Sequence, residues 1–188
     1  MPDAQPPPPP TAYSKKVCIL GDFAVGKTSL VRRFVYDRFD DKYISTIGVK
    51  VSRKVVVVAQ AGELTEVVML LWDLAGSEAF NQIRTSYLRG AAGAILVCDL
   101  TRPETLACLS VYADGLRSLA PDVPMVLAAN KRDLLPVPGG APEWVAEAAD
   151  RLAVPLYLSS ARLGDEVEAL FRHLGQMLVG ATAPDDPG

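Results

Sequence analysis

The sequence predicts an α/β fold: a six-stranded, mostly parallel β-sheet with five helices covering its two faces. Between residues 14 and 180, short and nearly continuous apolar runs alternate with helix-like segments, which is typical of a parallel sheet covered on both faces. The chain has 188 residues, of which 49% are hydrophobic, and this suits one domain with a sizeable core.

Six apolar runs have the length of buried strands. They are Val17–Leu20, Val51–Ala59, Val67–Trp72, Ala94–Cys98, Met125–Ala129 and Leu156–Leu158. Only residues 60–66 separate the second run from the third, which is too short for a crossover helix. We therefore expect these two runs to pair as an antiparallel hairpin, giving the sheet one antiparallel edge strand.

Five helix-like segments lie between or after the apolar runs. They are Thr28–Tyr36, Glu78–Tyr87, Pro103–Leu119, Pro142–Leu152 and Asp165–Leu178. Pro103 and Pro142 suit the first turn of a helix, where the N–H that proline lacks would have no partner. Thr101 and Asp165 are residue types that favour the N-cap position.

The distribution of proline sets the expected domain boundaries. Eight of the 15 prolines fall near the two ends of the chain, five of them consecutively at residues 6–10. We expect a folded domain at residues 15–180, with disordered tails at 1–14 and 181–188. The N-terminal proline run predicts an extended polyproline II spacer, and the alternative is a docking peptide for a proline-reading domain.

Composition argues against several classes of function. The net charge is −3, from 19 basic and 22 acidic residues well mixed, so no basic stripe predicts nucleic-acid binding. The three cysteines have no metal-ligand spacing, and Cys18 and Cys98 lie in apolar strand-like runs, so we expect these two to be buried free thiols in a reducing compartment. Neither a signal peptide, nor a membrane-spanning run, nor a cysteine near the C-terminus is evident. We expect a cytoplasmic protein without a direct lipid anchor.

A phosphate-binding loop is the strongest motif. Gly21-Asp-Phe-Ala-Val-Gly26-Lys27-Thr28 fits the pattern Gly-x-x-x-x-Gly-Lys-Ser/Thr, between an apolar run and a helix-like segment. Glycines let backbone N–H groups surround an anion, and the helix N-terminus adds unpaired donors. Lys27 can reach the outer phosphates and Thr28 can bind Mg²⁺. The alternative is a glycine turn before a helix.

A second motif, Trp72-Asp73-Leu-Ala-Gly76, follows an apolar run. Asp73 can hold Mg²⁺ through water, and the N–H of Gly76 can approach a terminal phosphate closely. The alternative is a capping aspartate followed by a turn glycine.

A third motif, Asn130-Lys131-Arg132-Asp133, predicts that the base is guanine. A carboxylate can accept the ring N–H and the exocyclic amine of guanine, whereas adenine has no such pair of donors. The stem of Lys131 can lie along the base. The alternative is an ordinary polar turn.

Two weaker segments complete the set. The backbone N–H groups of Ser159-Ser160-Ala161-Arg162, just past a short strand, could meet the guanine oxygen. In Tyr43-Ile-Ser-Thr46-Ile-Gly48, the Thr46 hydroxyl could complete the Mg²⁺ shell only when a third phosphate is present. Alone, each segment is an ordinary loop.

In this order and spacing, the five motifs resemble those of a Ras-superfamily small GTPase, and residues 43–49 are most similar to the Rab branch. The resemblance covers about residues 15–179 and implies a P-loop NTPase G domain that binds GTP, GDP and Mg²⁺. It implies nucleotide contacts from Ala24, Val25, Gly26, Lys27, Thr28, Ser29, Phe39, Tyr43, Thr46, Gly76, Asn130, Lys131, Asp133, Ser160, Ala161 and Arg162. It implies that Thr28, Thr46 and, through water, Asp73 hold the metal. Arg162 stands where the family commonly has lysine.

The resemblance also implies a catalytic set, Lys27, Thr46, Gly76 and the residue at position 77. Ser77 replaces the usual glutamine that orients water, and Phe23 replaces a usual glycine or serine. We therefore expect a switch with slow hydrolysis, binding effectors near residues 43–49 and 76–87 and open to an exchange factor and a GTPase-activating protein. The alternative is a nucleotide-locked module that never cycles. A P-loop kinase would leave the third motif unexplained.

Overall fold

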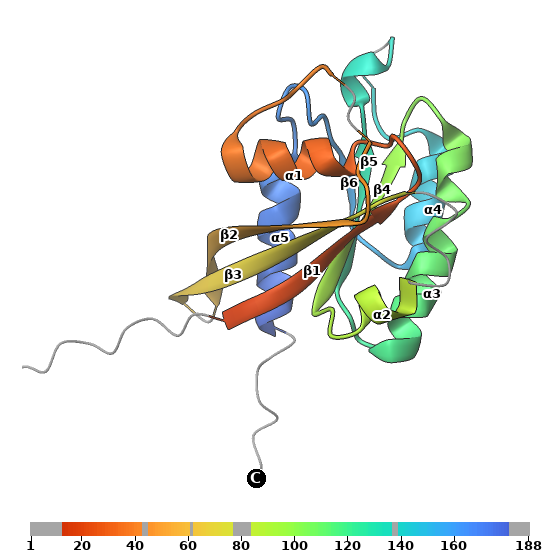
Figure 1. Cartoon of the computed structure of the whole chain (residues 1–188). Coiled ribbons are helices and arrows are strands. Elements are labelled where there is room, and N and C mark those ends of the chain that lie inside the picture. Colours follow the sequence, from red (N-terminus) through yellow and green to blue (C-terminus); the bar gives the residue numbers. More distant parts are fainter. Residues whose placement is uncertain (1–12, 43–44, 61, 77–83, 137–138, 181–188) are drawn as a thin grey trace, which may run out of the picture.

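The computed structural model describes residues 13–42, 45–60, 62–76, 84–136 and 139–180. Within them, six strands form one sheet in the order β2-β3-β1-β4-β5-β6 (Figure 1). The strands are β1 (Tyr13–Gly21), β2 (Val49–Gln60), β3 (Glu63–Leu74), β4 (Gly93–Asp99), β5 (Met125–Asn130) and β6 (Leu156–Leu158). Every neighbouring pair is parallel except β2 and β3. The predicted mostly parallel sheet with one antiparallel edge strand is therefore confirmed.

Five α-helices occur in the described part of the chain. They are α1 (Lys27–Tyr36), α2 (Arg84–Leu88), α3 (Leu109–Leu119), α4 (Glu143–Leu152) and α5 (Val167–Gly180). Figure 1 shows α1 and α5 on one face of the sheet and α3 and α4 on the other. None of the helices in these ranges is long and apolar enough to cross a membrane.

The core lies in two layers, one on each side of the sheet. Alternate residues of β1 enter different layers, with Val17 and Ile19 on the α1/α5 side and Cys18 and Leu20 on the α3/α4 side. This alternation explains why the central strands read as continuous apolar runs.

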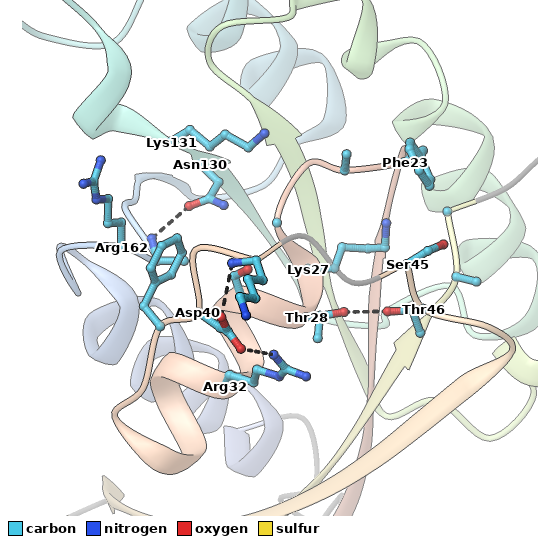
Figure 2. Close-up of a pocket in the computed structure, with 18 of the residues that line it drawn as sticks. Phe23, Lys27, Thr28, Arg32, Asp40, Ser45, Thr46, Asn130, Lys131 and Arg162 are labelled. Atoms are coloured by element: carbon cyan, nitrogen blue, oxygen red, sulfur yellow. Dashed lines mark hydrogen bonds and ion pairs between the residues drawn. The ribbon is translucent and has the colours of Figure 1, made fainter.

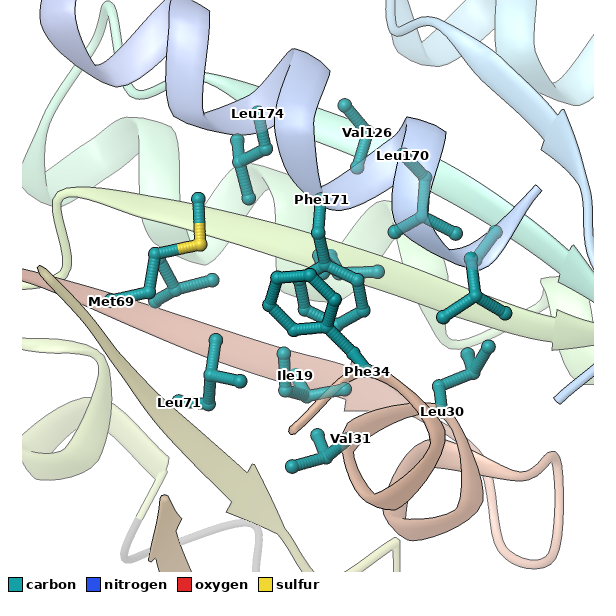
Figure 3. Close-up of a cluster of buried hydrophobic side chains, with 14 of the residues drawn as sticks. Ile19, Leu30, Val31, Phe34, Met69, Leu71, Val126, Leu170, Phe171 and Leu174 are labelled. Carbon is teal, nitrogen blue, oxygen red and sulfur yellow. The ribbon is translucent and has the colours of Figure 1, made fainter. Parts of the chain in front are cut away.

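An aromatic pair joins α1 to α5. Phe34 of α1 and Phe171 of α5 stack with ring centroids 3.9 Å apart (Figure 3). Both rings are buried, and the Lys54 ammonium lies 5.5 Å from the centroid of the Phe34 ring. The stack therefore anchors the helix that begins at the phosphate-binding loop.

The predicted helix at 103–119 is wrong as one continuous helix. Residues 103–106 form a 3-10 turn, and α3 begins only at Leu109. Thr105 is fully buried, and its hydroxyl donates to the carbonyl of Arg102 and accepts from the N–H of Asp99. These bonds hold the chain in a tight turn against the end of β4.

Three predicted helix starts are corrected as well. Thr101 is not a cap, because its hydroxyl donates to the Asp99 carboxylate. Pro142 lies at the N-cap of α4, one position before the first turn. Asp165 does not cap α5, which begins at Val167 after Glu166 in a left-handed conformation.

Some boundaries differ or cannot be compared. Strand β1 begins two residues before the expected domain start at Lys15. Residues 78–83 of the second predicted helix, and most of the two predicted tails, lie outside the described residues.

The sheet topology gathers the sequence motifs at one edge. Strands β1, β3, β4, β5 and β6 are parallel, so their carboxyl ends lie together. Gly21, Leu74, Asp99 and Asn130 end four of these strands. In open α/β sheets this edge is where ligands bind.

Candidate functional site

A cavity of about 580 Å³ opens at this edge of the sheet, a volume usual for a small-molecule site (Figure 2). Its walls come from residues within the ranges 23–32, 39–42, 45–48, 74–76, 130–134 and 161–162. Of the predicted site residues that the structure describes, Val25, Asp73 and Ser160 alone do not line the cavity. Tyr43 and Ser77 lie outside the described residues.

The phosphate-binding loop (residues 21–28, the P-loop) forms one wall. Gly26 has a φ of 101°, and a Cβ there would lie 2.2 Å from the side-chain nitrogen of Asn130, so only glycine fits. Ala24 also has a left-handed conformation, with a φ of 58°. Since α1 begins at Lys27, its unpaired N–H groups and positive dipole end face the cavity, as an anion requires.

Phe23 lines the cavity, and the residue is 46% exposed. Its N–H donates to the Asp22 carboxylate at 2.6 Å, so this N–H is already used within the loop. Because Phe23 belongs to the P-loop, its side chain lies on the phosphate-binding wall of the cavity, open to solvent.

Lys27 is a nearly buried cation in the P-loop. Its ammonium donates to the carbonyl of Gly21 at 3.0 Å and to that of Asp22 at 2.6 Å. Burial lowers the pKa of Lys27 from 10.5 to about 8, against the opposing attraction of Asp73. The cation lacks a close carboxylate partner among the described residues, and a phosphate would supply the missing negative charge.

Thr28, Thr46 and Asp73 bring hydroxyl and carboxylate oxygens together below the P-loop. The hydroxyls of Thr28 and Thr46 lie 2.8 Å apart, and the Thr28 hydroxyl donates to Asp73 Oδ2 at 2.5 Å. Asp73 Oδ1 is buried without a hydrogen-bond partner in the described part of the chain. Burial raises the pKa of Asp73, opposed by the Thr28 hydrogen bond and by Lys27. An all-oxygen set with an unsatisfied carboxylate oxygen fits Mg²⁺.

Gly76 lies against the P-loop. A Cβ at this position would be 2.6 Å from the carbonyl oxygen of Asp22 and 2.6 Å from the Lys27 ammonium, so a side chain cannot fit. The neighbouring Ala75 N–H donates to the Gly48 carbonyl at 3.0 Å. This bond joins the segment that carries Gly76 to the segment that carries Thr46.

Asn130 connects the opposite wall to the P-loop. Its amide nitrogen donates to the Val25 carbonyl at 2.9 Å, and its amide oxygen accepts the Ala161 N–H at 3.1 Å. The side chain is almost fully buried. In this structure Asn130 therefore ties the P-loop to the loop at residues 159–162, and its contact with the base stays a prediction.

The loop at 159–162 is held in a similar way. The N–H of Ser160 donates to the Asp165 carbonyl at 3.1 Å, so the N–H groups of both Ser160 and Ala161 have protein acceptors. The Ser160 hydroxyl donates to Asp133 Oδ1 at 2.6 Å, which orients the predicted guanine-reading carboxylate. Phe39 lines the cavity and packs on the α1/α5 core layer, leaving part of its ring for a ligand.

Sequence reasoning missed two arginines that join these segments. Arg33 of α1 donates to the carbonyl of Ala161 at 2.9 Å and to that of Arg162 at 2.5 Å. Arg102 donates to the carbonyl of Phe23 at 2.7 Å. Because both contacts join residues far apart in the chain, no local pattern could have identified them.

Comparison with known proteins identifies the family. A family model described as the Ras family matches residues 16–179. The chain belongs to the Ras family. The chain is 36% identical over 174 residues to Ras-related protein Rab-22A of Canis lupus familiaris, an alignment that covers 92% of this chain and 88% of the relative.

Two more relatives of this Ras-family chain support the same conclusion. Ras-related protein Rab-31 of Homo sapiens is 34% identical over 164 residues, covering 87% of this chain and 82% of the relative. GTP-binding protein ypt4 of Schizosaccharomyces pombe is 31% identical over 161 residues, covering 85% of this chain and 69% of the relative. The described sheet and helices are those of a Ras-family G domain, a P-loop NTPase fold. Ras-family proteins bind GTP and GDP, generally with Mg²⁺, and are GTPases.

Proposed function

We propose that this Ras-family chain is a Rab/Ras-like switch that binds GTP and Mg²⁺ and hydrolyses GTP slowly. The observation that carries the proposal is the exposed Phe23 side chain on the phosphate-binding wall of the cavity, combined with serine at position 77. Related enzymes already begin at about 10⁻⁴ per second without a partner, and most of their acceleration comes from positioning water and neutralising charge.

Each part of the site has a defined task in this proposal. Lys27 and the N-terminus of α1 stabilise negative charge on the outer phosphates. Thr28, Thr46 and, through water, Asp73 would hold Mg²⁺, which would supply positive charge to stabilise the phosphates. The Thr46 carbonyl and the Gly76 N–H orient the attacking water and the terminal phosphate.

The base end of the cavity supports selection of guanine. Asp133 lines the cavity with one oxygen held by the Ser160 hydroxyl. Lys131, Ala161 and Arg162 line the same end of the cavity, and Asn130 fixes that end to the P-loop. A carboxylate held in this way would be left unpaired by adenine and satisfied by guanine.

Slow hydrolysis follows from two substitutions that act in different ways. Serine is too short to orient water as the usual glutamine does. We propose that the exposed Phe23 side chain would obstruct an arginine from a partner, and such an arginine accelerates related enzymes by about 10³–10⁵.

Switching is supported by the bond between the two segments that would sense the third phosphate. The hydrogen bond from the Ala75 N–H to the Gly48 carbonyl would let the segments of Thr46 and Gly76 move together when the third phosphate binds or leaves. We propose that effectors bind near residues 43–49 and 76–87, where Ile47 is 95% exposed, and that an exchange factor and a GTPase-activating protein act on the same face. We also propose residues 15–180 as the functional domain.

The second candidate function is a nucleotide-locked interaction module. Phe23 favours it, because a ring that blocks partners would also prevent cycling. A half-life for release of bound GDP of many hours, with no change in partner binding between GDP and GTP, would favour the locked module over the switch.

Single-turnover hydrolysis of preloaded GTP tests the proposal. The native chain is compared with Ser77→Gln, Phe23→Gly and the control Leu64→Ala, an exposed residue of the β2–β3 hairpin. We expect slow turnover in the native chain and the control and faster turnover in Ser77→Gln. Fast hydrolysis by the native chain in the absence of any partner protein would overturn the proposal. Equal slow rates in the native chain and Ser77→Gln would show that Ser77 is not the brake. Because Phe23 is proposed to obstruct a partner's arginine, Phe23→Gly should hydrolyse faster than the native chain only when a GTPase-activating protein is present.

A further inference from the structure

A buried carboxylate lies at the end of β4, beside the cavity but outside its lining. Asp99 has no accessible surface, and its Oδ2 accepts Lys131 Nζ at 2.7 Å and Arg102 Nε at 3.1 Å. Its Oδ1 accepts the N–H of Thr101 at 2.9 Å and the Thr101 hydroxyl at 2.7 Å. Four donors therefore hold one buried carboxylate in place.

These donors keep Asp99 ionised. Burial alone would raise its pKa, but the hydrogen bonds from Lys131, Thr101 and Arg102 outweigh burial and hold the pKa of Asp99 below its usual value. A buried, charged acceptor makes stronger hydrogen bonds than a neutral one, so both cations are held firmly.

Arg102 connects this carboxylate to the P-loop. Its Nε donates to Asp99, and its terminal nitrogen donates to the Phe23 carbonyl at 2.7 Å. The 3-10 turn that follows, with the Thr105 hydroxyl bonded on both sides, holds the backbone of Arg102 against β4. Arg102 therefore contacts the loop from outside the cavity.

The hydrogen bond from Arg102 to the Phe23 carbonyl also fixes the direction of the next N–H in the P-loop. In a planar trans peptide, the carbonyl of one residue and the N–H of the next point in opposite directions. Since the Phe23 carbonyl points to Arg102, the N–H of Ala24 points the other way. Ala24 lines the cavity, so this orientation directs its N–H toward the phosphate end.

We propose that Arg102 is a positioning residue that, through Asp99, couples the P-loop at Phe23 to the base-reading loop at Lys131 and so slows nucleotide release. The proposal rests on the proposed function, since it requires that the cavity hold a guanine nucleotide. Arg102 acts by aiming the Ala24 N–H and by sharing Asp99 with Lys131, and it does not touch the nucleotide.

Release of a fluorescent GDP analogue from the full chain tests the proposal. We expect Arg102→Ala to release it about tenfold faster, as expected for loss of a hydrogen bond from a charged group. Arg102→Lys should recover part of the effect, because a lysine keeps the charge but cannot bridge Asp99 and the Phe23 carbonyl as a guanidinium does. The control Arg172→Ala removes an exposed ion pair with Glu168 and should release at the native rate.

A double-mutant cycle gives a readout that a purely structural role would not move. Arg102 and Lys131 share Asp99, so Arg102→Ala should accelerate release less in a Lys131→Ala background than in the native chain. In the control pair, Arg172→Ala should change the rate of GDP release by the same factor in the native chain and in the Lys131→Ala background.

The outcomes separate this inference from the proposed function. If the native chain does not retain the labelled GDP, the proposed function fails. If it retains GDP but Arg102→Ala changes release by less than roughly twofold, or if the effects of Arg102→Ala and Lys131→Ala simply multiply, the coupling is overturned. Should Arg102→Ala fail to fold, Arg102→Gln removes the charge while keeping a donor, and release at the native rate would overturn the proposal in the same way.

Discussion

Raising the pH from 7 to 9 should weaken GDP binding, because Lys27 loses its proton in the free protein. Burial sets the pKa of Lys27 to about 8 in the unliganded site. Roughly nine-tenths of the molecules then carry a charged Lys27 at pH 7 and roughly one-tenth at pH 9. Phosphate binds the charged form, so the dissociation constant should rise about tenfold, equivalent to about 1.4 kcal/mol.

The sign follows from the direction of the shift. A phosphate beside Lys27 favours the charged form and raises its pKa above that of the free protein, so binding takes up a proton near pH 8. Affinity should therefore be level below about pH 7 and fall above about pH 8.

Calorimetric titration with GDP at pH 7, 8 and 9, in buffers of different ionisation enthalpy, measures both affinity and proton uptake. A Lys27→Arg variant is the matched control, because arginine stays charged over this range and its affinity should not change with pH. Equal affinities of the native chain at pH 7 and 9, with no proton uptake near pH 8, would refute the reasoning.

Three further predictions concern the metal, a helix end and the core. Chelating Mg²⁺ with EDTA should accelerate GDP release from the native chain by roughly 5- to 150-fold. The acceleration should be much smaller for Thr28→Ala, because this variant lacks the hydroxyl that bonds Asp73 in the native chain. Equal acceleration of both proteins would show that Thr28 is not part of the metal site. Ala153 ends α4 with a φ of 52°, so Ala153→Gly should stabilise the GDP-bound protein by about 1 kcal/mol in urea unfolding, and destabilisation would contradict this. Phe34→Ala should lower the free energy of unfolding by about 3–5 kcal/mol, because it removes one ring of the buried stack. The exposed control Val111→Ala should change it by no more than about 0.5 kcal/mol. Similar values for both variants would show that the aromatic stack does not hold α1.

The sheet and most of the site could be predicted because their signals are local. Each buried strand reads as an apolar run, and the short link at residues 60–66 identifies the hairpin. Since parallel strands place their carboxyl ends together, the sequence predicts that the motifs at the strand ends meet at one edge of the sheet. The structure brings them together there, because Thr28 of the P-loop bonds Asp73. Asn130 bonds the P-loop carbonyl of Val25.

Features that depend on distant contacts could not be predicted. Arg102 and Phe23 are 79 residues apart in the chain, and Arg33 and Ala161 are 128 apart, yet each pair is hydrogen-bonded. The break before α3 likewise arises because the Thr105 hydroxyl bonds the end of β4, which overrides the helical pattern of the segment. In each case a side chain bonds a backbone group on another element, and this leaves no periodic trace in the sequence.

The central claim is that the site senses the third phosphate through Thr46 and Gly76. Hydrogen–deuterium exchange of residues 45–49 and 74–76, compared between the GDP-bound chain and the chain bound to a non-hydrolysable GTP analogue, tests it most directly. We predict slower exchange in both segments with the GTP analogue, because Thr46 would bind Mg²⁺ and the Gly48–Ala75 bond would transmit the change. Identical exchange in the two nucleotide states would contradict the switch and leave a nucleotide-locked module.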